Sequence, residues 1–309
     1  MISTPSIYSY GKLKIVTEVA AWNAVTAFEN NKFSPIVVVT SEIGSSQQVN
    51  YPVKSANMDL EEFVQEAAVA EFNNPNGRFT TAEFSIDAFS INGTLLANSF
   101  RPGLVGTDRT NYQDLNDVYA IQMFVNRAKQ GGGYVINVYQ NPATGNEEVK
   151  LNYVLPIDET WFITSGKYQP EYDAYVSPDK RAEMIQYVRE IEALMQEKGK
   201  EETADLLNNG TLFREDMRMR IFDYNGTYVV GYPYTQELVG TSSLGVTDIY
   251  GASIGREVLT MAQSGGGFRY MYYPYLSGET KLTLTYVEPI DDEWYAMISL
   301  PLTMIGSAS

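Results

Sequence analysis

The nine residues Gly131–Tyr139, with the sequence GGGYVINVY, decide the fold of this 309-residue chain because they occur twice. The second copy is GGGFRYMYY, residues Gly265–Tyr273. In each copy three glycines precede a run of aromatic and other strand-forming residues, which is typical of a strand that follows a break in the chain. A single pair of this kind can arise by chance, so the residues around the two copies decide whether the chain is duplicated.

Four further blocks around the glycines recur in the same order, 133 or 134 residues later. Solenoid repeats have units of about 20–50 residues, so a period this long predicts a duplicated domain instead. The matched pairs are Asn92–Thr94 with Asn225–Thr227, Leu104–Thr107 with Leu238–Thr241, Tyr153–Asp158 with Tyr286–Asp291, and Trp161 with Trp294.

Composition narrows the classes of function. With 44% hydrophobic and 13% aromatic residues, each half of the chain can bury a core. The net charge of −16 argues against nucleic acid as a partner, because phosphate binding needs clustered lysine and arginine. The chain has no cysteine and no histidine, which excludes thiol nucleophiles, Ser-His-Asp triads, histidine acid–base chemistry and most zinc sites.

Hydrophobic periodicity and turn signals predict an α+β fold with two tandem units. Each unit is expected to contain an antiparallel sheet of about five strands and a long N-terminal helix. The expected organisation is an N-terminal helix and extended connection over residues 1–57, a first unit over 58–175 and a second unit over 176–309. Helices are expected over Lys12–Phe28, Asp59–Ala68, Asp117–Lys129 and, after the cap at Ser177, from Pro178, with a further helix over Glu201–Asn208.

A series of short motifs connects these elements with a known family. The segment from Leu60 to Tyr168 resembles the extracytoplasmic Cache sensor domain of the single-unit type, and residues 178–302 resemble it more weakly, so the chain is similar to two such units in tandem. The second unit lacks the Asn-Pro turn. The motifs of the first unit are Ala70–Asn73, Asn92–Thr94, Pro102–Gly106, Gly131–Tyr134, Asn141-Pro142, Lys150–Val154 and Trp161. The resemblance implies a PAS-like fold and a role in binding small extracellular molecules, typically small carboxylates, for a chemoreceptor or sensor kinase.

Strand alternation places the candidate ligand-binding residues of the first unit on one sheet face. Successive side chains of a strand point to opposite faces, so Asn137 and Tyr139 share a face that Ile136 does not. Lys150 and Asn152 have the matching parity on the neighbouring strand. We expect these four polar side chains to line a pocket; the alternative is a sheet face exposed to solvent.

The loop after the first hairpin adds Phe100, Arg101 and Tyr112 to the expected site. A guanidinium can hold a carboxylate through two parallel hydrogen bonds, and the family resemblance implies a basic residue before the proline of this loop. Arg101 is therefore the leading candidate for an anion anchor, and its alternative is an ordinary surface arginine. Arg109, Tyr112 and Tyr119 are weaker candidates, and the alternative for each is an ordinary loop or core residue.

In the second unit the residue equivalent to Arg101 is Thr235, and the residue equivalent to Asn137 is Met271. Because both polar groups are missing, we expect the first unit to bind the ligand and the second to be a spacer or to bind something different. A weaker second pocket is expected from Tyr232, Tyr234, Arg269, Met271 and Tyr273.

No catalytic residue, metal or cofactor is expected. The oxygen-rich loop of residues 108–117 does not have the spacing of an EF-hand, so a solvated loop is favoured over a calcium site. Acidic pairs such as Glu61/Glu62 and Asp291/Asp292 leave an acid–base hydrolase as a remote alternative. A structural spacer without any ligand is the other alternative.

The expected partner is a small-molecule ligand, outside the cytoplasm, at the cell surface or in an equivalent of the periplasm. No apolar run approaches the length of a membrane span, so contact with a membrane is expected only through an anchor that this chain lacks. A homodimer through the N-terminal helices is a further expectation. The chain is then either part of a receptor or a free or lipid-anchored binding protein.

Overall fold

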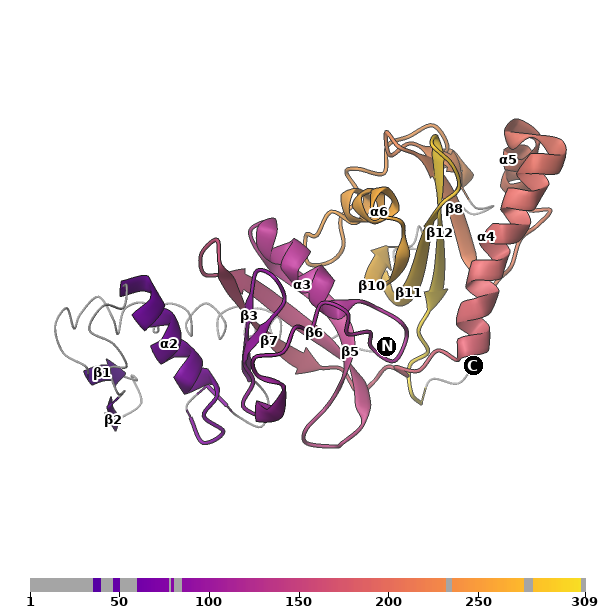
Figure 1. The fold of residues 1–309 in the computed structure, drawn as a ribbon. Helices are drawn as coiled ribbons and strands as arrows, with labels where there is room; N and C mark the ends of the chain where they lie inside the picture. The colour runs from indigo at the N-terminus through magenta and orange to yellow at the C-terminus, as the bar shows by residue number, and fades with distance from the viewer. Residues whose placement is uncertain are drawn as a thin grey trace.

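Two five-stranded antiparallel sheets, one from each repeat, form the body of the protein (Figure 1). The computed structural model describes residues 36–39, 47–50, 60–77, 79–80, 85–231, 235–274 and 280–306. The expected α+β class, with one antiparallel sheet of five strands in each unit, is confirmed. The helix expected over Lys12–Phe28 lies outside the described residues. A separate pair of short antiparallel strands, β1 (Ile36–Val39) and β2 (Gln47–Asn50), precedes the first unit.

The first sheet has the strand order β4-β3-β7-β6-β5. Helix α2 packs beside β3 and β4, and helix α3 covers β5 and β6. The elements are α2 (Leu60–Phe72), β3 (Ile86–Ser90), β4 (Leu95–Ala97), the 3₁₀ helix η1 (Pro102–Leu104), α3 (Ala120–Lys129), β5 (Gly133–Gln140), β6 (Glu147–Pro156) and β7 (Trp161–Tyr168).

The second sheet repeats this topology, with the order β9-β8-β12-β11-β10. Two helices precede it, and helix α6 takes the place of α3 over the sheet. The elements are α4 (Pro178–Lys198), α5 (Lys200–Asn208), β8 (Arg218–Asp223), β9 (Tyr228–Val230), η2 (Gln236–Leu238), α6 (Ile254–Gln263), β10 (Gly267–Pro274), β11 (Thr280–Pro289) and β12 (Trp294–Pro301).

The glycine triplets bring the end of a helix close to the backbone of a neighbouring strand. At Gly132, with φ +91°, a β-carbon would lie 2.6 Å from the carbonyl oxygen of Val154. At Gly266, with φ +82°, it would lie 2.2 Å from the carbonyl oxygen of Val287. Only glycine tolerates both the positive φ and the close approach. The repeated glycines therefore fix how α3 and α6 lead into β5 and β10.

The two units share one hydrophobic core. Ile136 and Val138 of β5 are buried in the same cluster as Met184 of α4 and Tyr270 of β10. The opposite side of β5 is different, because Val135 is buried in a cluster with α3. The alternation predicted for β5 is thus confirmed, and one of its faces is used for contact with the second unit.

A buried polar network around Asn116 joins the two units. The Asn116 side chain donates to the carbonyl oxygen of Ala174 and to the Tyr270 hydroxyl, both at 2.7 Å, and accepts from the Val176 amide at 3.0 Å. Asp114 accepts from the Asn116 amide at 2.9 Å, and burial raises the pKa of Asp114 to about 6. The prediction of a solvated loop is wrong here, because Asn116 is completely buried and Asp114 nearly so.

Replacing Asn116 with alanine tests the importance of this network. The change removes the side-chain partner of the buried Val176 amide and of the Ala174 carbonyl oxygen, so we expect the free energy of unfolding to fall by about 2–4 kcal/mol. Urea denaturation of both proteins measures the difference. The exposed Asn111→Ala is the matched control and is expected to change little; an equal effect of both variants would contradict the role of the network.

Candidate ligand-binding site

The first unit contains a cavity between its sheet and helix α3. It encloses about 30 Å³ of free space, which is room for about two water molecules. Its apolar wall consists of Phe89, Leu95, Ile121 and Phe124, with the last two contributed by α3. The rest of the lining is polar. The sheet contributes Asp87, Asn137, Tyr139, Lys150 and Asn152, and the loops contribute Asn98, Arg109 and Tyr112.

A buried pair of opposite charges lies on the sheet side of this cavity. The ammonium nitrogen of Lys150 lies 3.7 Å from Oδ2 of Asp87, and both residues are more than nine-tenths buried. Burial raises the pKa of the Asp87 carboxyl, although the nearby Lys150 opposes this rise. Oδ1 of Asp87 has no hydrogen-bond partner among the described residues. This pair is longer than a direct hydrogen bond, so both groups retain capacity for a ligand.

Two buried amides lie beside the charged pair. Nδ2 of Asn152 donates to Oδ1 of Asn137 at 2.7 Å, and both side chains are almost completely buried. The expected face of Asn137, Tyr139, Lys150 and Asn152 is therefore enclosed by the protein and is not a solvated sheet surface.

The loop between β4 and α3 supplies the opposite wall. The guanidinium of Arg109 lies 4.7 Å from the ring centre of Tyr112, and this ring meets that of Tyr139 edge to face at 6.0 Å. In the described part of the chain, no carboxylate lies within ion-pair distance of Arg109. Arg109 therefore brings a positive charge to the cavity that no acidic side chain neutralises directly.

Arg101 lies at the edge of the cavity and not in its lining. Its guanidinium stacks 4.2 Å above the ring centre of Tyr139 and donates to the Gln140 side chain at 3.0 Å. Phe100 is 43% exposed and also does not line the cavity. Arg101 is therefore placed at the rim, where it covers one side of Tyr139. Tyr119, the weaker candidate, is exposed as well.

Asp87 and Asn98 line the cavity although they were not among the residues expected from the sequence, and Arg109, a weaker candidate, lines it as well. The sequence does indicate Asp87, because it lies in the apolar strand IDAFS two residues before Phe89, and residues two apart in a strand point to the same face. No sequence pattern indicates Asn98, since its position depends on how the loop after β4 folds back.

The equivalent region of the second unit is nearly full. Its cavity encloses about 10 Å³, and Tyr228, Tyr273 and Tyr295 line it. Arg220 takes the position of Asp87 and stacks 4.3 Å from the ring centre of Tyr273. Arg269 and Met271 do not line this cavity and instead contribute to another one between the units. Tyr232 and Tyr234 lie outside the described residues.

A family model described as Cache domain matches residues 76–302, which include both sheets. The chain belongs to the Cache domain family. The match confirms the resemblance read from the motifs of the first repeat, and it continues through the second unit.

The solved structures that match this Cache protein are distant from it in sequence. A periplasmic sensor domain of a chemotaxis protein is 15% identical, with coverage of 53% of this chain and 99% of that one and a TM-score of 0.40. A Cache chemosensory domain described for carboxylic acid recognition is 17% identical, with coverage of 54% and 99% and a TM-score of 0.39. A methyl-accepting chemotaxis protein from Vibrio parahaemolyticus is 16% identical, with coverage of 52% and 88% and a TM-score of 0.37. Among curated protein sequences, none matches the chain.

In the ranges that the structure describes, no three acidic side chains gather as a metal site. Within the same ranges, no helix has the length and apolarity needed to cross a bilayer.

Gly166 of β7 makes the space that Lys150 and Asn152 occupy. A β-carbon at this position would lie 2.3 Å from Cε of Lys150 and 2.3 Å from Oδ1 of Asn152. The second unit has Ser299 at the equivalent position, where its hydroxyl lies 3.2 Å from that of Thr285. The polar lining of the first cavity therefore depends on a glycine behind it.

Gly166→Ala is expected to force Lys150 and Asn152 from their positions and to lower the free energy of unfolding by about 1–3 kcal/mol. Thermal or urea denaturation measures this loss. Gly103→Ala is the matched control, because nothing lies within 4 Å of a β-carbon placed there. A Gly166→Ala protein as stable as the control variant would show that the two side chains are not held against this glycine.

Proposed function

We propose that the first Cache unit binds a small carboxylate-bearing molecule in the cavity beneath α3. In this proposal the chain is the extracytoplasmic sensing part of a signal-transduction receptor, or a free or lipid-anchored binding protein with the same ligand. The observation that carries the proposal is the presence of Lys150 and Arg109 in one enclosed cavity. Membership of the Cache family supports the sensing role and the location.

The chemistry of the lining favours an anionic ligand. Lys150 is buried and Arg109 has no direct carboxylate partner in the described ranges, so a ligand carboxylate would gain charge-assisted hydrogen bonds from both sides. The Asn137–Asn152 pair supplies further polar groups beside them. The free space of about 30 Å³ fits only a very small molecule as the cavity stands. A larger ligand therefore requires α3 or the loop to move outward.

Asp87 favours a second candidate, a zwitterion such as an amino acid. Its Oδ1 has no hydrogen-bond partner in the described part of the chain, and an ammonium group is a suitable donor for it. A ligand with both charges would then pair with Asp87 at one end and with Lys150 and Arg109 at the other. Neither candidate ligand requires a catalytic acid–base pair in the cavity.

Binding is tested by a thermal-shift screen of small carboxylates and amino acids, followed by calorimetric titration of the best ligand. A ligand that binds the native state raises the melting temperature. We expect Lys150→Met and Arg109→Gln each to weaken binding by about tenfold or more, because each removes a charged donor. Arg101→Ala is expected to weaken it less, since Arg101 lies at the rim.

Lys167→Met is the matched control for Lys150→Met, because Lys167 is an exposed lysine of the same sheet. Arg109→Gln provides the test if Lys150→Met fails to fold. Unchanged affinity in both cavity variants would overturn the proposed site. A screen without any hit would favour a spacer without a ligand.

The pH dependence of binding tests the role of Asp87. Because burial raises the pKa of Asp87 above its ordinary value, Asp87 becomes neutral as the pH falls through that raised pKa. Its repulsion of an anion is then lost and Lys150 is free to pair with the ligand. Affinity for pyruvate, which stays ionised, is therefore expected to rise as the pH is lowered from neutral through the raised pKa of Asp87.

In Asp87→Asn the affinity for pyruvate is expected to be higher at neutral pH and nearly independent of pH. An amino acid would instead bind Asp87→Asn more weakly, because its ammonium loses an anionic partner. Calorimetry at several pH values with both ligands distinguishes the two candidates.

A further inference from the structure

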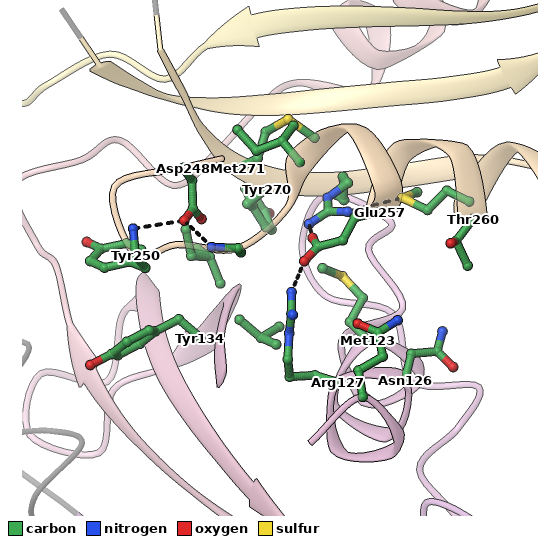
Figure 2. A pocket seen from close by; sticks show the side chains of 17 residues that line it. Met123, Asn126, Arg127, Tyr134, Asp248, Tyr250, Glu257, Thr260, Tyr270 and Met271 are labelled. Carbon is green, nitrogen blue, oxygen red and sulfur yellow. Dashed lines mark hydrogen bonds and ion pairs between the residues drawn. The ribbon is translucent and has the colours of Figure 1, made fainter. Parts of the chain in front are cut away.

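A second cavity lies between the two units (Figure 2). Within the described ranges it shares no lining residue with the cavity beneath α3. Its lining comes from α3 and β5 of the first unit, and from α6, β10 and the loop before α6 of the second. It encloses about 70 Å³ of free space, more than twice that of the cavity beneath α3 and enough for about five water molecules.

One carboxylate in this cavity forms ion pairs with two guanidinium groups. Glu257 of α6 pairs with Arg127 of α3 and with Arg269 of β10, so the contact crosses from one unit to the other (Figure 2). The side chains of all three residues are at most 14% exposed. Both guanidiniums use a terminal nitrogen for Glu257, which leaves their other nitrogens to be satisfied in another way.

The Nε atoms of Arg127 and Arg269 are buried and have no hydrogen-bond partner within the described ranges. A buried donor without an acceptor is costly, and such groups are rare in native proteins. The other acid of the cavity, Asp248, already accepts from the amides of Tyr250 and Ala252 through Oδ1, at 2.8 and 2.9 Å. The two guanidiniums therefore have spare Nε–H donors, while Oδ1 of Asp248 is already engaged by backbone amides.

The remaining walls are largely apolar. The rings of Tyr134 and Tyr250 lie with their centres 4.9 Å apart. Three methionines complete the apolar lining, and Sδ of one of them, Met261, lies 3.9 Å from Nη1 of Arg269; the other two are Met123 and Met271. Methionine side chains adapt readily to the shape of an apolar ligand. We propose that this cavity binds a short-chain monocarboxylate such as propionate, whose oxygens accept from the two Nε–H groups while its hydrocarbon part lies against these walls. The proposal does not depend on ligand binding in the first unit.

Titration of the full chain with sodium propionate, followed by the NMR signals of the methionine methyl groups, tests this site directly. Propionate is expected to shift the methyl signals of Met123, Met261 and Met271 in a saturable manner. Propionamide has the same shape without the charge and is expected to cause little change, because a guanidinium donates most strongly to a charged acceptor. Equal binding of both compounds would overturn the proposed anion site.

The variants Arg269→Lys and Arg127→Lys test the role of the two Nε–H donors. Lysine keeps the positive charge next to Glu257 but has no N–H group at the position of the arginine Nε. Each variant is expected to weaken propionate binding by about tenfold or more. Arg256→Lys, an exposed arginine of α6, is the matched control and is expected to bind as the wild type does.

Ala252→Leu supplies an independent test that leaves every charge in place. The larger side chain is expected to fill the cavity and to abolish the propionate-dependent methionine shifts. If the two lysine variants and Ala252→Leu all retain wild-type binding, the proposal is wrong, and the cluster serves only to hold the units together.

Discussion

The enclosure of strand β5 on both faces is the constraint on which the rest of the structure depends. One face, with Ile136 and Val138, is buried against the second unit, so the strand cannot turn its polar residues outward. Asn137 must then lie under α3, where it needs a partner and finds Asn152. The site of the first unit is thus a result of how the two units pack, because a lone sheet would leave one of these faces to solvent.

The two repeats share one topology, but the polar residues that line their cavities differ. At equivalent strand positions the first unit has Asp87 and the second has Arg220, and the two amides Asn137 and Asn152 correspond to Met271 and Thr285. Bulky tyrosines fill much of the space in the second unit. A duplicated fold can therefore retain its backbone, through the glycines at the helix ends, while one copy keeps room for a small molecule and the other does not.

Much of this could be predicted from the sequence, because repeats and strand alternation are local patterns. The two sheets, the Asn-Gly hairpins and the shared face of Asn137 and Lys150 follow from such patterns. The position of Arg101 could not be predicted, since its stacking on Tyr139 and its hydrogen bond to Gln140 depend on how a loop meets the end of a distant strand. Arg127 and Glu257 meet only because two units pack together, and no pattern within one unit indicates this.

Helix α3 forms a wall of both cavities. Ile121 and Phe124 line the cavity of the first unit, while Met123 and Arg127 line the one between the units. A displacement of this ten-residue helix therefore changes both volumes at once. If both cavities bind the proposed ligands, occupancy of one that moves α3 alters affinity in the other, and thermodynamic linkage makes the effect equal in both directions. The helix would then make the protein an integrator of two chemical signals, with a coupling free energy set by the stiffness of a single element.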